Sequence, residues 1–555
     1  MSRRLVLVLL GATALGIGAY FSIARPGLLR EAVELTAQGG ERQLSDTLRP
    51  ARGGTRVLVV ALDGVGRDML RHTLERGGMP RLAGLMGAPG ADGVHEHAYA
   101  SPHTVSIMPS TTMAAWSSVY TGKSPAATGV PGNEWFDRTS MRYFAPAPVS
   151  VSGHQHTLAM LSDGLVGNAL AVPTLFERAA VRSYVSLAPV FRGADMFTMP
   201  DPTSVADLFT AVAGGIVDDG LIDRDAYAVV DTTAIDNVIE TIDRHGLPDL
   251  QVVYFPGIDL YTHGADEPLQ SQERYLSEVV DGALGRVFDL YARLNALEST
   301  WVVITADHGH TPVIADDRHA LEADGDDEPP AVLARAGFRL RPFVLVPDDD
   351  QQDFQATVAY QGALAYVYLA DRSTCIDPGT RCDWGRFPRI QEDVLPVARA
   401  FDAANRIGEG VPALRGTHDM IMIRSGDDNG GRLDVFDDGV LVPLPEHLAR
   451  QPRPDLVRFE ERMNGLVDGP LGHRAGDILL LARSGEHRTI ADRYYFSTRY
   501  RSWHGSPHAQ DSEVPLVVAR SGAAGSAIRD VAVEEFDGLR SQLDVTPLVL
   551  SLLQR

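Results

Sequence analysis

Short, uninterrupted apolar runs that alternate with helical segments constrain the fold of this chain more than any other feature. The runs cover residues 57–62, 251–255, 301–305, 477–482 and 514–519. Between them, residues 271–295 repeat apolar side chains near helical spacing. A strand that is apolar at almost every position is typical of a parallel sheet covered on both faces. We therefore predict an α/β sandwich in which strands and helices alternate.

The chain is too long for one compact core, because it has 555 residues. The strand and helix alternation is interrupted at 321–469, which opens with the acidic loop 324–330 and continues with short β-like runs at 343–346 and 363–369. We interpret 321–469 as an insertion or cap domain. The α/β core is then expected over 55–320 and 470–555.

The N-terminus has the composition of an export segment. Arg3 and Arg4 precede an apolar run without charges at residues 5–23, which is long enough to span a bilayer. Ser22 and Ala24 place small side chains where a signal peptidase cleaves. We predict a signal peptide or membrane anchor at 1–24, a tether at 25–54, and an extracytoplasmic location, periplasmic or secreted, with or without a membrane tether through 5–23.

The chain has two cysteines, Cys375 and Cys382, and a Pro-Gly pair lies between them. Such a pair favours a turn that brings the two thiols together. In an oxidising compartment we expect a small disulfide loop. The alternative is two unrelated free thiols.

The charge balance argues against a nucleic-acid partner. Fifty Lys and Arg stand against 73 Asp and Glu, which gives a formal net charge of -23. A surface this acidic repels a phosphate backbone. It does not exclude a small phosphate substrate, because bound metal ions reverse the sign of the field within a site.

Carboxylates and imidazoles follow several of the predicted strands. Because ligands bind outside the carboxyl ends of strands in open α/β sheets, side chains placed there converge in space. Three aspartates occupy such positions, two of them accompanied by a histidine, and a later His-Gly pair lies in a Ser/Pro loop. The set is Asp63, Asp259, His263, Asp307, His308 and His504.

This set of side chains predicts a zinc site. Imidazole combined with carboxylate suits zinc better than magnesium or calcium. Six protein ligands are too many for one tetrahedral ion but adequate for two Zn²⁺ ions that keep positions open for substrate. Loop residues without a metal role could explain any one pair of these side chains, but not all of them.

A candidate nucleophile lies at the start of a predicted helix. Thr112 precedes the helical segment 113–122. A hydroxyl in this place is by default an N-cap. The alternative is catalytic, because a helix N-terminus attracts an anion and a neighbouring metal ion lowers the pKa of a hydroxyl.

The order of these motifs resembles the alkaline phosphatase superfamily, and most closely its type I phosphodiesterase/nucleotide pyrophosphatase branch. The motifs are Asp-Gly after the first strand, Pro-Ser-x-Thr-x-x-Ala-Trp, Asp-x-x-x-His, Asp-His-Gly and a late His-Gly. The likeness covers residues 56–130, 250–312 and 476–555. It implies a three-layer α/β/α sandwich, a small phosphate ester or nucleotide as substrate, and a phosphothreonine intermediate.

The resemblance also implies roles for individual residues. One zinc would be held by Asp63, Asp307 and His308, with Thr112 bridging toward it. The other zinc would be held by Asp259, His263 and His504. Thr112 would attack phosphorus. His103, His310 and His508 lie near motifs, but we do not expect them to be ligands.

Two departures from the family pattern concern the substrate. Met113, Ala114 and Ala115 stand where nucleotide pyrophosphatases usually have Phe-Pro-Asn, whose asparagine holds a phosphate oxygen. The segment 503–508 is also similar to periplasmic phosphate-monoester hydrolases. We predict hydrolysis of diesters ahead of monoesters, and a monoester hydrolase is the alternative.

Other members of the fold fit the sequence less well. A sulfatase should show Cys/Ser-x-Pro-x-Arg at the nucleophile, and this motif is absent around Thr112. A catalytically silent binding protein of the same fold would not need all seven key side chains. The sequence therefore favours a metal-dependent phosphoric ester hydrolase.

Overall fold

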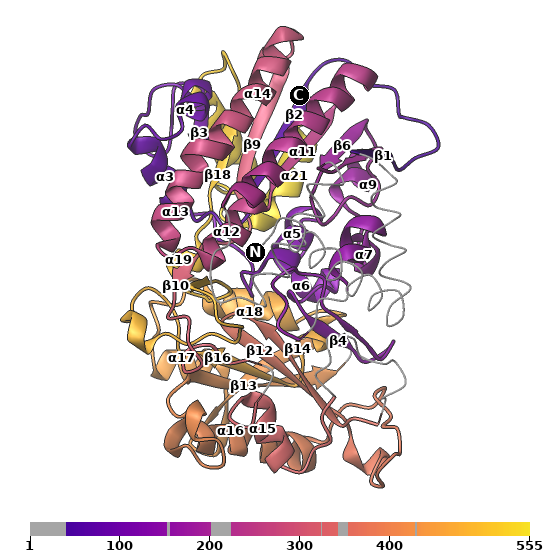
Figure 1. Cartoon of the computed structure of the whole chain (residues 1–555), viewed down its shortest axis with the longest axis vertical. Coiled ribbons are helices and arrows are strands. Elements are labelled where there is room, and N and C mark those ends of the chain that lie inside the picture. The colour runs from indigo at the N-terminus through magenta and orange to yellow at the C-terminus, as the bar shows by residue number, and fades with distance from the viewer. Residues whose placement is uncertain (1–39, 153–155, 201–223, 323–324, 342–352, 428–429) are drawn as a thin grey trace, which may run out of the picture.

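The computed structural model describes residues 40–152, 156–200, 224–322, 325–341, 353–427 and 430–555. Two lobes lie one above the other along the long axis, and each is built on its own sheet (Figure 1). The predicted signal or anchor segment at 1–24, residues 25–39 of the tether and the β-like run at 343–346 lie outside the described residues. Within the described ranges, no helix has the length and apolar character needed to cross a membrane.

Eight strands form the sheet of the upper lobe, in the order β1-β7-β6-β8-β2-β9-β18-β3. They are β1 (Glu41–Gln43), β2 (Arg56–Leu62), β3 (Ala98–Ala100), β6 (Ser183–Ser186), β7 (Met196–Thr198), β8 (Leu250–Phe255), β9 (Thr300–Ala306) and β18 (Leu516–Ala519). The central strands β6, β8, β2 and β9 run parallel. Strand β1 pairs with β7, so residues 41–43 of the predicted tether belong to this sheet.

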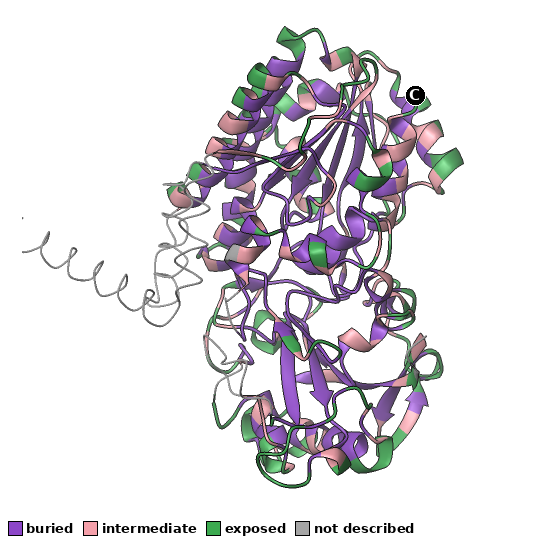
Figure 2. Ribbon diagram, turned by 90° about the vertical axis from the view of Figure 1, so that its right-hand side faces the viewer, coloured by how far each residue is buried: buried purple, intermediate pink, exposed green. Residues whose placement is uncertain are grey.

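Helices cover both faces of the upper sheet, which gives the predicted three-layer α/β/α sandwich (Figures 1 and 2). Every residue of β2 from Val57 to Leu62 is buried, and burying one large aliphatic side chain contributes about 1.5–3 kcal/mol. The covering helices include α3 (Arg67–Glu75), α4 (Pro80–Met86), α5 (Thr112–Val119), α9 (Leu175–Ala179), α11 (Arg224–His245), α13 (Pro268–Tyr275), α14 (Asp281–Arg293) and α21 (Val545–Leu552). A π-helical turn, Leu276–Val280, joins α13 to α14, so the predicted helix at 271–295 is continuous.

The lower lobe contains an antiparallel sheet of six strands, in the order β11-β12-β16-β13-β14-β15. They are β11 (Ala356–Gln361), β12 (Leu364–Leu369), β13 (His418–Asp427), β14 (Gly430–Asp437), β15 (Val440–Pro443) and β16 (Ile478–Ala482). Its helices are α15 (Pro329–Arg335), α16 (Leu395–Ile407), α17 (Leu444–Arg450) and α18 (Phe459–Val467). Alternate side chains along each strand enter two separate cores, one with α15 and α16 and the other with α17 and α18.

Two of the five predicted parallel strands are placed differently in the structure. The prediction for 477–482 is wrong, because β16 lies inside the antiparallel lower sheet. The strand at 514–519 does join the upper sheet, but β18 runs antiparallel to β9. Both runs are apolar because both faces of each strand are covered. Apolar character therefore does not indicate whether a strand is parallel or antiparallel to its neighbours. Residues 478–482, expected in the α/β core, therefore belong to the lower sheet.

The remaining named helices and strands lie outside the two large sheets. They are α6 (Pro125–Thr128), β4 (Trp135–Asp137), β5 (Arg142–Phe144), α7 (Thr157–Ser162), α8 (Leu165–Ala169), α12 (Gly257–Gly264), β10 (Thr311–Pro312), β17 (Ser502–Trp503), α19 (Ala509–Ser512) and α20 (Gly525–Phe536). Of these, α12 and the segment around β17 carry residues of the candidate site.

Cys375 and Cys382 form the expected disulfide in the lower lobe. The two residues are separated by seven positions, and both side chains are buried. The carbonyl oxygen of Cys375 accepts hydrogen bonds from Gln355 Nε2 and Arg339 Nη2, each at 3.1 Å. The loop is therefore tied to the segment that leads into β11.

We expect protein recovered from an oxidising compartment to show no free thiol when it is denatured without reductant. Replacing both cysteines with serine should lower the free energy of unfolding by about 2.5 kcal/mol, because the short loop restricts the unfolded chain. Thiol titration and chemical denaturation measure the two effects. Two reactive thiols in the unreduced protein would refute the bridge.

Candidate active site

The predicted ligands meet at the carboxyl edge of the upper sheet. Asp63 directly follows β2, and Asp307 and His308 directly follow β9. Helix α12 begins two residues after β8 and carries Asp259 and His263 one helical turn apart. Because β2, β8 and β9 are adjacent and parallel, their ends place these side chains together.

The first cluster surrounds the Nε2 atom of His308. This atom lies 3.3 Å from Asp307 Oδ2 and 3.6 Å from Asp63 Oδ1. It also lies 3.2 Å from Thr112 Oγ1. All four side chains are buried. The structure thus brings together the three residues predicted for one metal ion and the predicted nucleophile.

The second cluster adjoins the first. Asp259 Oδ2 lies 3.4 Å from His263 Nε2, and Asp259 Oδ1 lies 4.0 Å from His504 Nε2. The imidazole rings of His504 and His308 are stacked, with centroids 3.5 Å apart. The residues predicted for the second metal ion therefore lie together, beside those predicted for the first.

The protein fixes the orientation of the three predicted histidine ligands. In each, Nδ1 lies within hydrogen-bond distance of a backbone carbonyl oxygen. The pairs are His263 with Ser502 at 2.8 Å, His308 with Gly309 at 3.1 Å, and His504 with Ser110 at 3.2 Å. A carbonyl can only accept, so Nδ1 carries the proton and Nε2 keeps its lone pair. The buried Nε2 atoms of His263 and His504 have no hydrogen-bond partner among the described residues.

Two of the carboxylates are anchored through one oxygen only. Asp63 Oδ2 accepts a hydrogen bond from the Tyr254 hydroxyl. Asp307 Oδ1 accepts from the backbone N–H groups of Gly64 and His308, at 2.9 and 3.0 Å. The other oxygens, Asp63 Oδ1 and Asp307 Oδ2, are buried and have no hydrogen-bond partner in the described part of the chain.

The electrostatics of the site suit a bound cation. Burial raises the pKa of Asp63, and the charges of Asp307 and Asp259 raise it further. Burial also raises the pKa of Asp307, to about 7. For the imidazole of His308 burial lowers the pKa to about 3, so its lone pair is free at neutral pH. Buried carboxylates that repel one another, next to neutral imidazoles, suit divalent metal ions.

Asp259 behaves differently because two imidazoles contact it. Burial by itself would raise the pKa of Asp259, but His263 and His310 lower it. The Nε2 atom of His310 lies 2.7 Å from Asp259 Oδ1. Nδ1 of His310 lies 3.1 Å from the Ser502 hydroxyl, which donates to Thr262 O. His310, which we did not expect to be a ligand, therefore belongs to the cluster through Asp259, whereas His103 is exposed outside it.

The structure distinguishes between the two interpretations of Thr112, as a helix N-cap and as a nucleophile. The N-cap of α5 is Thr111, and its side chain makes no capping hydrogen bond. Thr112 is the first residue of the helix, and its hydroxyl faces His308. Its hydroxyl is therefore directed to the metal-ligand cluster and does not cap the helix.

Asn133 is a candidate site residue that the sequence pattern does not indicate. Asn133 Oδ1 accepts a hydrogen bond of 3.0 Å from the backbone N–H of Met113, the residue after Thr112. The hydrogen bonds that Asn133 makes among the described residues use its Oδ1 and its backbone N–H, not its Nδ2 group. Asn133 lies in a Gly/Pro-rich loop far along the chain from Thr112. The one available signal was the absence of an asparagine at position 115, which leaves its contact either absent or supplied by another residue.

The lower lobe contacts this site through the turn between β11 and β12. Gln361 Oε1 accepts a hydrogen bond of 2.7 Å from the backbone N–H of Asn133. The backbone N–H of Ala363 donates to His504 O at 3.2 Å. Gly362 has a φ of +69°, and a Cβ there would lie 2.0 Å from His504 O. Only glycine fits between this turn and His504.

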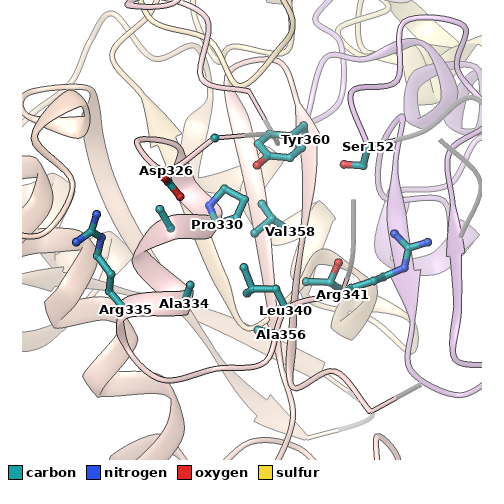
Figure 3. Close-up of a pocket in the computed structure, with 13 residues that line it drawn as sticks. Ser152, Asp326, Pro330, Ala334, Arg335, Leu340, Arg341, Ala356, Val358 and Tyr360 are labelled. Atoms are coloured by element: carbon teal, nitrogen blue, oxygen red, sulfur yellow. The ribbon is translucent and has the colours of Figure 1, made fainter. Parts of the chain in front are cut away.

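A separate cavity of about 760 Å³ lies in the lower lobe beside β11 and α15 (Figure 3). Its lining combines apolar residues such as Leu340 and Val358 with Asp326, Arg335 and Arg341. The Arg341 guanidinium lies over the ring of Tyr143, 4.4 Å from its centroid. None of the predicted site residues lines this cavity.

Comparisons with known proteins give one family match. The sequence model described as type I phosphodiesterase / nucleotide pyrophosphatase matches residues 57–373. Among solved structures, murine ectonucleotide pyrophosphatase / phosphodiesterase 5 is similar, with a TM-score of 0.48 and 13% identity over 90% of this chain and 95% of that chain. The phosphonoacetate hydrolase from Sinorhizobium meliloti 1021, in complex with phosphonoformate, is also similar. Its TM-score is 0.44, with 17% sequence identity over 92% of this chain and 100% of that chain. No match was found among curated protein sequences.

Proposed function

The chain belongs to the type I phosphodiesterase/nucleotide pyrophosphatase family, and from this premise we propose that it is a two-zinc phosphoric ester hydrolase with Thr112 as its nucleophile. One observation carries the proposal. Unpartnered ligand atoms of buried aspartates and histidines converge beside the Thr112 hydroxyl. Structural side chains are normally satisfied when buried, so atoms left free in one place favour a site that holds ions.

The proposed ligands divide into two sets of three. Asp63, Asp307 and His308 would hold one ion, to which Thr112 would also contribute its hydroxyl. The other three ligands would be Asp259, His263 and His504. Zinc fits these nitrogen and oxygen donors, and when bound it would act as a Lewis acid toward phosphoryl oxygens.

The protein's own groups would divide the reaction into two displacements. Thr112 Oγ1 attacks phosphorus, and the P–O bond to the leaving group breaks as the new Oγ1–P bond forms. The hydroxyl proton of Thr112 passes to the leaving oxygen, so that the leaving group departs as an alcohol or a phosphate. In the second step the oxygen of water attacks phosphorus and the Oγ1–P bond breaks. The phosphate product leaves, and Oγ1 takes a proton from the water, which restores the Thr112 hydroxyl. The N–H groups at the start of α5 favour the anionic substrate during both steps.

Asn133 would hold a phosphoryl oxygen in place of the asparagine absent at position 115. The backbone N–H of Met113 donates a hydrogen bond to Asn133 Oδ1, and this bond fixes the orientation of the side-chain amide, including its Nδ2 group. A donor aimed at developing charge contributes typically a 10²–10³-fold effect on rate.

We therefore expect Asn133→Ala to lower kcat/KM by about 10²-fold while zinc content stays at the wild-type level. Asn464→Ala, which removes an exposed asparagine from α18, is the matched control and should leave kcat/KM unchanged. Steady-state kinetics with a chromogenic phosphate ester and zinc analysis give the two readouts. An Asn133→Ala enzyme with wild-type kcat/KM would exclude this role.

We also propose that diesters are hydrolysed faster than monoesters, with a monoester hydrolase as the alternative. Support comes from the family and from the turn at 361–363, through which the lower lobe contacts the site. Deleting 321–469 is not a clean test, because β16 would lose both of its neighbouring strands.

Competition kinetics with paired aryl diesters and monoesters test this ranking directly, and we expect the larger kcat/KM for the diester. A monoester value tenfold above the diester value, about 1.4 kcal/mol of transition-state binding, would reverse the assignment.

We further propose that the enzyme is exported. The apolar run at 5–23 behind Arg3 and Arg4, together with the disulfide, supports an oxidising, extracytoplasmic location. N-terminal sequencing of the mature protein would distinguish cleavage near residue 24 from retention as a membrane anchor.

A further inference from the structure

A second group of potential metal ligands lies outside the proposed catalytic clusters. One ligand atom from each of Asp455, His487 and His508 lies within 4.8 Å of the others. Three distant segments supply them: the loop before α18, the loop after β16, and the loop between β17 and α19. Nothing in the proposed reaction uses these side chains.

His508 is the buried member of the group, with a side chain that is 1% exposed. Its Nδ1 lies 3.2 Å from the backbone carbonyl oxygen of Asp455. Nδ1 also lies 3.7 Å from Asp455 Oδ2, so Nδ1 is the ring nitrogen that faces the carboxylate. It can bind a cation in the tautomer that carries the ring proton on Nε2, an atom that is buried and has no hydrogen-bond partner among the residues that the structure describes. In that tautomer Nδ1 and the two Asp455 oxygens are all acceptors that face one another, which favours a bound cation.

The backbone is shaped to admit the His508 ring. A Cβ at Gly485 would lie 2.1 Å from Cδ2 of His508, and Gly485 has a φ of +93°. Glycine is thus required there for two independent reasons.

His487 and Asp455 complete the donor set. The ring centroids of His487 and His508 are 4.4 Å apart, and His487 Nε2 lies 3.5 Å from Asp455 Oδ2. Arg453 holds the Asp455 carboxylate through Nε–Oδ1 and Nη2–Oδ2 contacts of 3.0 and 2.7 Å. Metal-binding carboxylates are usually hydrogen-bonded in this way, and they keep lone pairs for the ion.

The positive charges near this group are already paired with carboxylates. Arg488 donates to both oxygens of Asp419, at 2.7 and 3.0 Å. Arg453 contacts Asp419 as well, at 3.2 Å. Two arginines and two aspartates balance one another, so no net positive charge opposes a bound cation.

We propose that Asp455, His487 and His508 bind a third divalent metal ion, which their donor set identifies as zinc. Two imidazoles and one carboxylate with an open fourth position are a common zinc ligand set. Ligand bonds of about 2.0–2.1 Å require the donor atoms to approach to about 3.3 Å. His487, whose side chain is 33% exposed on a loop, can make this movement.

The ion would connect the loop that carries His504 to the lower lobe. His508 lies four residues after His504, and the backbone N–H of Val457 donates to Pro507 O at 2.9 Å. Asp455 and His487 flank this contact. Bound zinc would therefore stabilise the segment that positions His504, without contacting substrate.

Zinc counting in the full chain tests the proposal independently of catalysis. The background variant Asp259→Ala/Asp307→Ala removes a carboxylate from each catalytic cluster. After zinc loading and desalting, we expect it to retain one zinc per chain and to show a zinc-dependent rise in Tm. Adding His487→Ala should remove the bound zinc and the zinc-dependent rise in Tm. Adding His72→Ala, on the exposed face of α3, should leave the zinc and the Tm rise unchanged.

The proposal is overturned if the background retains no zinc, or if its zinc and Tm rise survive His487→Ala and Asp455→Asn. If the background variant does not fold, the same count is made on the otherwise unchanged chain, where His487→Ala should remove one zinc. Wild-type hydrolysis by the Asp259→Ala/Asp307→Ala variant, with its zinc still lost on adding His487→Ala, would contradict the catalytic proposal and leave the third ion supported.

Discussion

Thr112→Ala is expected to lower kcat by several orders of magnitude, on the order of 10⁴-fold, while zinc content stays near that of the wild type. The hydroxyl is the attacking group, and the aspartates and histidines remain in place without it. Thr112→Ser should retain part of the activity, because it keeps a hydroxyl at the start of α5.

Thr111→Ala provides the matched control for this experiment. Thr111 is the adjacent buried threonine and the N-cap of the same helix, but its side chain makes no capping hydrogen bond. We expect its removal to leave kcat close to the wild-type value. Steady-state turnover of a chromogenic ester measures both variants, and mass spectrometry of acid-quenched protein should detect phosphate on Thr112. A Thr112→Ala enzyme that turns over near the wild-type rate would refute the nucleophile.

Removal of metal is expected to abolish hydrolysis, and added zinc should restore it. Without cations, the buried oxygens of Asp63 and Asp307 repel one another, and burial together with neighbouring charge raises the pKa of Asp63. The soluble protein should hold about two zinc ions in the catalytic clusters, as six nitrogen and oxygen ligands require. The test is to measure turnover before chelation, after chelation, and again after zinc is added back.

A ligand variant separates loss of metal from general damage by the chelator. Asp307→Asn keeps the side-chain shape but removes the charge, and we expect it to lose zinc from the first cluster and most activity. Asp317→Asn changes an exposed carboxylate of the same kind and should retain both. Full activity in thoroughly metal-free protein would exclude the two-ion site.

Much of the upper lobe could be predicted from the sequence, because its strands are continuous apolar runs. Strands β2, β8 and β9 lie where the runs at 57–62, 251–255 and 301–305 placed them. The positions of Asp63, Asp259 and Asp307 then followed, because residues after parallel strands share one edge of the sheet. The π-helical turn within 271–295 and the antiparallel direction of β18 were not encoded in this pattern.

In the lower lobe, an apolar run predicted a strand but not the sheet to which the strand belongs. Ile478–Ala482 is buried at every position, as a parallel core strand would be. Its two faces instead enter two cores of an antiparallel sheet, one toward α15 and α16 and the other toward α17 and α18. Burial on both faces makes both kinds of strand apolar, so hydrophobicity alone cannot assign the sheet.

The sequence by itself determined which residue types could bind metal, and the order of its motifs indicated how they divide between two ions. The tertiary structure alone decided which further groups join them. Asn133 reaches Met113, His310 reaches Asp259, and Gly362 leaves room for His504. The first two contacts join α5 to the loop after α6, and α12 to the segment after β9, at the edge of the upper sheet, and the third joins the β11–β12 turn of the lower lobe to the segment of His504. No local spacing records such contacts, because they depend on how these segments pack in three dimensions.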